Sequence, residues 1–165
     1  MKSLIHHSGD VSSSDSKHKT FRKILLVLIL ITLALIWGQS AMSRQDSEAE
    51  SAWVMELIMP FLEIFVGRGR VTLHLVRKLA HFTEYALLGA ELTLYSVFGM
   101  KDAASPLIGK TSVFLPLIIG LAAAAADETI QIFSGRGPAV ADVLLDFCGV
   151  LTAFIFIKLV ERYFS

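Results

Sequence analysis

The stretch RKLAHFTEYALLGAELTLYSVF, residues 77–98, decides the fold. Its length and mainly apolar content match a helix that crosses the ~30 Å hydrocarbon core of a bilayer. The residues that recur at the three- and four-residue spacing of one helix face are mostly polar: His81, Glu84, Leu88, Glu91 and Tyr95. A polar stripe on a membrane helix must be covered by other helices. We therefore predict an all-α membrane protein with several packed spans.

Three further apolar segments flank this helix, over residues 24–42, 113–133 and 141–163. Apolar residues make up 54% of the chain and charged residues 18%, with a mean hydropathy of +0.62. A soluble domain carries about a quarter charged residues, so we predict a polytopic protein with four transmembrane helices. The first segment has some features of a signal peptide, but the polar region before it is too long, which favours a retained helix.

Two other segments of the N-terminal half do not look like spans. Residues 1–20 are rich in Ser, Asp, Lys and His without periodicity, which predicts a disordered cytoplasmic tail. Residues 53–66 are too short to span and contain Pro60, with Glu56 and Glu63 on one face of an otherwise apolar helix. This pattern predicts an amphipathic helix that lies in the membrane interface.

Basic residues predict how the chain is oriented in the cell membrane. Lys17, Lys19, Arg22 and Lys23 precede the first span, so the positive-inside rule places the N-terminus in the cytoplasm. Four spans then return the C-terminus to the cytoplasm. A second basic group, within residues 68–78, runs against this orientation.

Composition and spacing exclude several kinds of site. The formal net charge is zero, which gives no electrostatic support for a nucleic-acid partner. The single cysteine, Cys148, cannot form an intramolecular disulfide or a cysteine-based zinc site, and we interpret it as inert packing. Residues 104–111 fit a relaxed phosphate-loop pattern, but Pro106 removes a backbone donor and no strand precedes it. No nucleotide site is predicted.

Polar residues at the ends of three predicted spans should gather near one face of the bilayer. Each of them lies within roughly 10 Å of the same surface, because a helix rises 1.5 Å per residue. Small residues share the helix faces of the last two spans, which indicates close helix approach in a bundle interior. The carboxyl groups outnumber the cations, so the surplus must be protonated, hydrated or neutralised by a bound cation. The polar set comprises His81, Glu84, Asp127, Glu128, Gln131, Asp142 and Asp146.

The same residues form a series of motifs along the chain. The series is K-x2-H-F-x-E-Y at 78–85, D-E-x2-Q at 127–131, G-R at 135–136 and D-x3-[DN]-x2-G at 142–149. In this order it resembles the VanZ-like family, over residues 77 to about 155, and we assign residues 21–165 to one VanZ-like transmembrane domain. One departure is Asp146, where the family often carries Asn. The resemblance implies a cell-envelope protein related to one associated with resistance to the lipoglycopeptide teicoplanin, and it implies no particular reaction.

We predict a ligand-binding set that follows these motifs: Lys78, His81, Glu84, Tyr85, Asp127, Glu128, Gln131, Arg136, Asp142 and Asp146. Arg136 could clamp a phosphate or carboxylate through its planar fork, or neutralise the carboxylates beside it. The candidates for acid–base catalysis are His81, Glu84, Asp127 and Glu128. The same side chains could ligate a metal, or form a network that only fixes the bundle geometry. We assign no metal site and identify no cofactor.

The function that we favour is the non-enzymatic binding of a membrane lipid or lipidated amphiphile in this polar pocket, with Arg136 and His81 contacting its anionic part. A role in glycopeptide resistance follows from the resemblance alone. The alternative is an intramembrane enzyme, with or without a metal, that acts on a lipid headgroup. A purely structural membrane subunit is a third interpretation, and homo-oligomerisation stays open.

Overall fold

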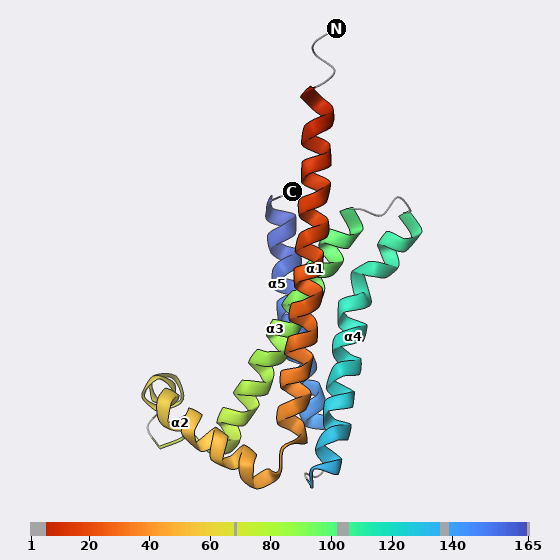
Figure 1. Cartoon of the computed structure of the whole chain (residues 1–165). Coiled ribbons are helices and arrows are strands. Elements are labelled where there is room, and N and C mark those ends of the chain that lie inside the picture. The colour runs from red at the N-terminus through yellow and green to blue at the C-terminus, as the bar shows by residue number, and fades with distance from the viewer. Residues whose placement is uncertain (1–5, 68, 102–105, 136–138, 165) are drawn as a thin grey trace.

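The computed structural model describes residues 6–67, 69–101, 106–135 and 139–164, and nearly all of these residues are helical (Figure 1). The five helices are α1 (His6–Ala41), α2 (Arg44–Val66), α3 (Leu73–Lys101), α4 (Pro106–Phe133) and α5 (Val140–Phe164). The described part of the chain contains no strand. The all-α prediction is therefore confirmed.

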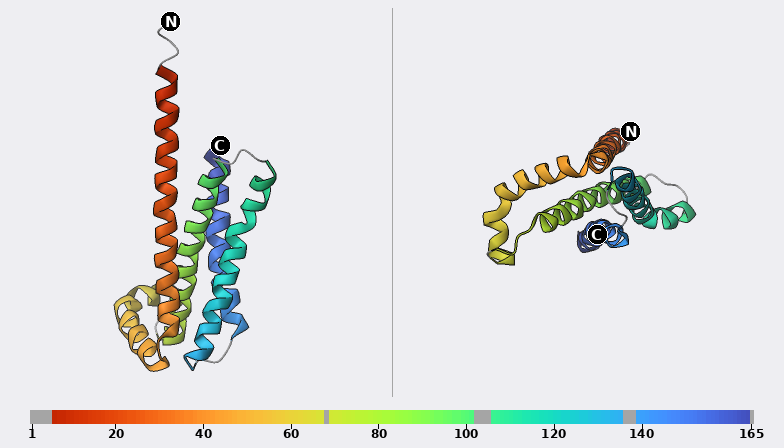
Figure 2. Two further views of the ribbon diagram at one scale, coloured as in Figure 1. Left: turned by 45° about the vertical axis from the view of Figure 1, so that its right-hand side comes forward. Right: turned by 90° about the horizontal axis from the view of Figure 1, so that it is seen from below.

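Four of the helices run side by side, whereas α2 lies at a steep angle to them across one end of the bundle (Figures 1 and 2). Helix α3 is central and contacts each of the other four helices. The start of α1 and the end of α5 lie at the same end of the bundle, opposite to α2 (Figure 1).

Three helical segments are long and apolar enough to cross a membrane by length and composition: Ser16–Ala41, Val113–Phe133 and Val140–Phe164. Helix α3 is long enough, but its charged residues keep it outside this group. The prediction of a membrane protein is supported, and the count of four spans stays a prediction.

The burial pattern is that of a bundle surrounded by lipid. Large apolar side chains cover the outer surface of α1, α4 and α5, among them Leu30, Leu35, Phe114, Ile118 and Phe156. A soluble monomer rarely exposes so continuous an apolar surface. Polar side chains are instead buried between the helices: Thr32, Ser40, Ser51, Glu91, Thr93, Ser96, Asp127, Glu128, Gln131 and Asp146.

The hydrophobic core lies between the four helices that run side by side. Its buried members come from α1 (Ile29, Ile36), α3 (Tyr85, Leu88, Leu92), α4 (Ala123, Ala124) and α5 (Val150). Helices α3 and α5 approach most closely where glycines replace side chains, at Gly89 on α3 and Gly149 on α5. Small residues allow this approach, as the sequence pattern predicted for α5.

All five helices begin earlier than the sequence indicated, α1 and α2 by the largest margins. Helix α1 starts at His6, so it includes part of the segment that we predicted as a disordered tail. Adding a residue to an existing helix is far easier than starting one, and the apolar part of α1 supplies that start. Helix α2 starts at Arg44 because Ser43 caps it, with its Oγ accepting a hydrogen bond from the Asp46 backbone N–H at 3.3 Å.

Candidate functional site

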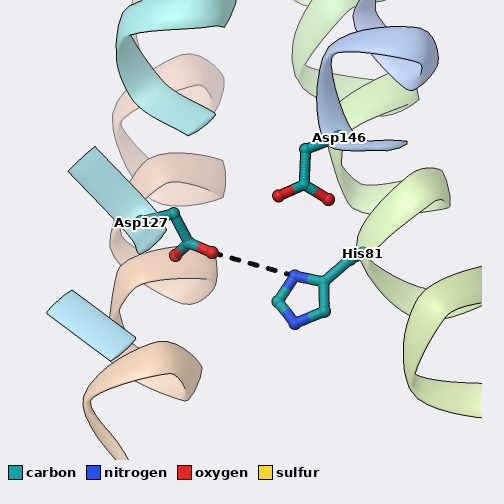
Figure 3. A group of neighbouring side chains, drawn as sticks. All are labelled: His81, Asp127 and Asp146. Atoms are coloured by element: carbon teal, nitrogen blue, oxygen red, sulfur yellow. Dashed lines mark ion pairs between the residues drawn. The ribbon is translucent and has the colours of Figure 1, made fainter. Parts of the chain in front are cut away.

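The polar residues of three helices meet at the end of the bundle where α2 lies. Helix α3 contributes His81, α4 contributes Asp127 and α5 contributes Asp146, and Figure 3 shows their side chains pointing toward one another. Asp127 is 0% exposed and Asp146 is 3% exposed. Because α3 and α5 run in the same direction and α4 runs opposite to them, the start of α3, the end of α4 and the start of α5 lie at the same end of the bundle (Figure 1).

His81 is half-buried and faces two carboxylates at this end of the bundle. Its Nδ1 lies 3.9 Å from Asp127 Oδ2 and 3.9 Å from Glu84 Oε2. These separations exceed the length of a hydrogen bond. The imidazole therefore faces two carboxylates on two helices at a distance that leaves room between them.

Asp127 is held in place by the helix that carries it and by α1. Gln131 Nε2 donates to Asp127 Oδ2 at 2.9 Å and to Ser40 Oγ at 3.5 Å. Ser40, on α1, is fully buried, and the sequence analysis did not single it out. The polar pair Gln39-Ser40 at the end of an apolar segment, level with the predicted cluster, is the signal that could have identified it.

Glu128 and Asp142 join the same end of the bundle but face different partners. Glu128 Oε1 accepts a hydrogen bond from the Ala139 backbone N–H, just before α5 begins. Asp142 Oδ1 lies 3.1 Å from Lys78 Nζ, in a half-exposed ion pair between α3 and α5. Asp142 lies in the first turn of α5, where a carboxylate also interacts favourably with the helix dipole.

Two polar residues that the sequence analysis singled out on α3 make hydrogen bonds outside the cluster of His81, Asp127 and Asp146. Tyr85 is fully buried and donates through its hydroxyl to the Ala123 backbone carbonyl at 3.2 Å, which makes it a core residue. Glu91 lies about two turns further along α3, and its Oε1 accepts a hydrogen bond from Thr32 Oγ1 at 3.1 Å. Arg136 lies outside the described residues.

A cleft of about 120 Å³ opens beside the cluster, between α2, the end of α1 and the start of α3. Its lining includes His81 and Glu84, which face the cluster as well. Arg77 also lines the cleft and forms no ion pair with any described residue. The lining is Gln39, Ser47, Ser51, Val54, Val76, Arg77, Ala80, His81 and Glu84.

The arrangement offers two kinds of chemistry. The cleft presents Arg77, His81 and neutral polar groups beside the carboxylate of Glu84, and Arg77 can bind the polar part of an anionic ligand. The cluster presents an imidazole and buried carboxylate oxygens, which suit a proton or a cation. Cys148, the only thiol in the chain, is exposed on α5, so it supplies no nucleophile to the buried cluster.

A comparison with protein families gives one match, to the family described as VanZ/LLP1, over residues 24–161. The match covers most of the chain, including all the described residues of the cluster and the cleft. Comparisons with curated proteins and with solved structures each found no match.

Proposed function

The chain belongs to the VanZ/LLP1 family, and from that premise we propose that it binds the polar end of a lipid or lipidated amphiphile in the cleft beneath α2. The observation that carries the proposal is a small polar cleft beside α2. The outward face of α2 is apolar, with Trp53, Leu57 and Phe61 all more than 60% exposed. Such a face is typical of a helix at the boundary between headgroups and acyl chains, which supports a cleft at headgroup depth.

The size of the cleft limits what can enter it. Pockets that enclose a drug-sized ligand measure about 300–1,000 Å³, whereas this cleft measures about 120 Å³. A phosphate or carboxylate group fits this space, whereas a whole amphiphile does not. The acyl chains would therefore remain outside, along the exposed apolar surfaces of α1 and α2.

The preference for an anionic headgroup would come from Arg77, which lies in the lining together with the carboxylate of Glu84. Arg77 can present its planar fork to two oxygens of a phosphate, and His81 adds a second nitrogen donor from the same helix. Lys78 is paired with Asp142 and does not line the cleft. We therefore expect Arg77 to carry the preference for phosphate.

Native mass spectrometry of the detergent-purified protein would test this proposal. We expect the protein to retain phosphatidylglycerol in preference to phosphatidylcholine with the same acyl chains. Arg77→Gln should weaken phosphatidylglycerol binding about tenfold or more, because a hydrogen bond to a charged group contributes about 1.5–3 kcal/mol. The matched control is Arg70→Gln, since Arg70 is exposed and does not line the cleft.

Equal retention of the two lipids, or equal losses in Arg77→Gln and Arg70→Gln, would contradict the proposal. Teicoplanin serves as a separate ligand in the same assay, because it is a lipidated amphiphile of a different headgroup chemistry. Binding of teicoplanin without phosphatidylglycerol would assign the cleft to the antibiotic and refute the lipid.

We further propose that both termini are cytoplasmic and that the cleft faces the outer leaflet, with α3 as the fourth span. Lys17, Lys23 and Arg162 lie toward the end of the bundle where α1 begins and α5 ends, as the positive-inside rule requires. Lys78, one of the basic residues at the other end that run against this orientation, is paired with Asp142.

Thiol labelling of intact cells tests this orientation. Ser134 follows α4 directly, near the turn at the α2 end of the bundle. A Ser134→Cys protein in a Cys148→Ala background should react with a membrane-impermeant maleimide from outside. The Cys148→Ala protein alone is the control for background labelling. Reaction only after permeabilisation would invert the topology and place the cleft at the inner leaflet.

A further inference from the structure

The cluster of His81, Asp127 and Asp146 contains buried carboxylate oxygens that accept no hydrogen bond from any described residue. One donor atom from each of the three residues lies within 4.8 Å of the other two (Figure 3). Asp127 Oδ1 and Asp146 Oδ1 are buried and have no hydrogen-bond partner among the described residues. Buried oxygens of this kind are costly unless a proton donor or a cation meets them.

The charges of the three residues do not balance by themselves. Two buried carboxylates carry two negative charges, and a protonated His81 would neutralise one of them. Glu84, 3.9 Å from the His81 ring, adds a further carboxylate. A divalent cation, a neutral imidazole and two carboxylates together carry no net charge.

The geometry is close to that of a metal site. In a tetrahedral zinc site with bonds of about 2.1 Å, the ligand atoms lie about 3.4 Å from one another. The separation of 3.9 Å between His81 Nδ1 and Asp127 Oδ2 exceeds this spacing by about 0.5 Å. The widest spacing, up to 4.8 Å, needs a contraction of about 1.4 Å, which rotation of the His81 and Asp146 side chains can supply.

An outer hydrogen bond supports one of the three ligands. Gln131 Nε2 donates to Asp127 Oδ2 at 2.9 Å and fixes the plane of this carboxylate. Metal-ligating carboxylates are commonly oriented by such partners. The same oxygen, Oδ2, faces His81 across the space between the helices (Figure 3).

We propose that His81, Asp127 and Asp146 bind a divalent transition-metal ion, with Zn²⁺ the ion of choice. An imidazole with two carboxylates matches Zn²⁺ better than Ca²⁺ or Mg²⁺, which take six or more oxygen ligands. Three protein ligands leave one coordination position for water or an oxygen of a bound molecule. The site requires neither the lipid nor Arg77, so it stands or falls separately from the proposed function.

Metal analysis of the full-length protein in detergent tests the proposal. Protein stripped with a chelator, loaded with Zn²⁺ and desalted should carry about one ion per chain, as a single site requires. Asp127→Asn, Asp146→Asn and His81→Gln should each reduce the bound zinc about tenfold or more. Gln131→Ala should weaken zinc binding by about 10–100-fold, the usual effect of removing an outer partner. The control is Glu161→Gln, which removes a carboxylate of α5 that is paired with Lys158.

Two further measurements keep the test decisive if a variant does not fold. An excess of Ca²⁺ should leave the zinc of the wild-type protein in place, whereas a diffuse acidic cluster would exchange it. The Co²⁺-loaded wild-type protein should show the intense visible absorption of a four- or five-coordinate site. Substoichiometric zinc, displacement by Ca²⁺, or the weak spectrum of octahedral Co²⁺ would each overturn the proposal.

Discussion

Gly149→Ala is expected to destabilise the bundle by more than about 3 kcal/mol, the upper range for overpacking a close contact. A Cβ atom added at Gly149 would lie 2.5 Å from the Phe82 carbonyl oxygen and 3.0 Å from the Ala86 backbone nitrogen. Both atoms belong to the backbone of α3, so no side-chain rotation relieves the clash. The two helices would have to move apart along their largest interface.

The loss of stability expected for Gly149→Ala is opposite in sign to the usual effect of replacing glycine by alanine in a helix. Alanine is normally more favourable than glycine inside a helix by about 1 kcal/mol. Gly38→Ala should follow that rule, because Gly38 lies in α1 with no atom within 4 Å of an added Cβ. Gly89, on α3, faces α5 at the same interface, and its added Cβ would lie 2.6 Å from Val150 Cα. Gly89→Ala should therefore destabilise the protein as Gly149→Ala does.

Thermal unfolding of the detergent-purified variants, followed by tryptophan fluorescence, measures these changes. We expect a lower melting temperature for the two variants at the α3–α5 contact and an unchanged or higher one for Gly38→Ala. A Gly149→Ala protein as stable as the wild type would show that α3 and α5 do not approach as closely as described.

The second large effect is expected at Tyr85, the largest fully buried side chain. Tyr85→Ala should cost about 3–5 kcal/mol, the range for deleting a buried aromatic ring. The ring fills the core between α1, α3, α4 and α5, and its loss leaves a cavity that rigid helices cannot close. Reversible unfolding in mixed micelles gives the free energy, and Tyr163→Ala, at an 84% exposed tyrosine, is the control.

Tyr85→Phe removes the hydroxyl and keeps the ring, so it separates their contributions to stability. The Ala123 carbonyl accepts from the Tyr85 hydroxyl at 3.2 Å and from Trp37 Nε1 at 3.4 Å, so removing one donor leaves the other. We expect Tyr85→Phe to cost about 0.6–1.7 kcal/mol, as for other hydrogen bonds between membrane helices. A loss as large as that of Tyr85→Ala would mean that the hydroxyl, and not the volume of the ring, stabilises the core.

Much of this fold follows from helical periodicity. Apolar length predicted the helices that became α1, α3, α4 and α5, and the stripe containing Ala124, Asp127 and Gln131 is buried in the structure. Placement of Asp127 and Asp146 at one end of the bundle followed from the rise per residue alone. These features depend on local geometry, which a sequence carries directly.

Other features depend on how the helices pack against one another, which the helical periodicity of the sequence does not report. The cleft exists because α2 turns back across α3 and brings Ser47 and Ser51 opposite Arg77. The contribution of Ser40 depends on which face of α1 meets α4. Tyr85 stays a predicted ligand contact, and the bond of its hydroxyl to the backbone of α4 likewise depends on how α3 and α4 pack.

The charged residues of α3 have a consequence for how the protein is made. In the proposed topology, α3 carries Glu91 into the hydrocarbon, and an ionised group there costs a single helix about 2.5–3.5 kcal/mol at the translocon. Thr32 of α1, which leaves the ribosome before α3, donates a hydrogen bond to Glu91, whereas the largest interface of α3 is with α5, which leaves last. We therefore expect α3 to insert beside α1 and to reach its final packing only after α5 has been made.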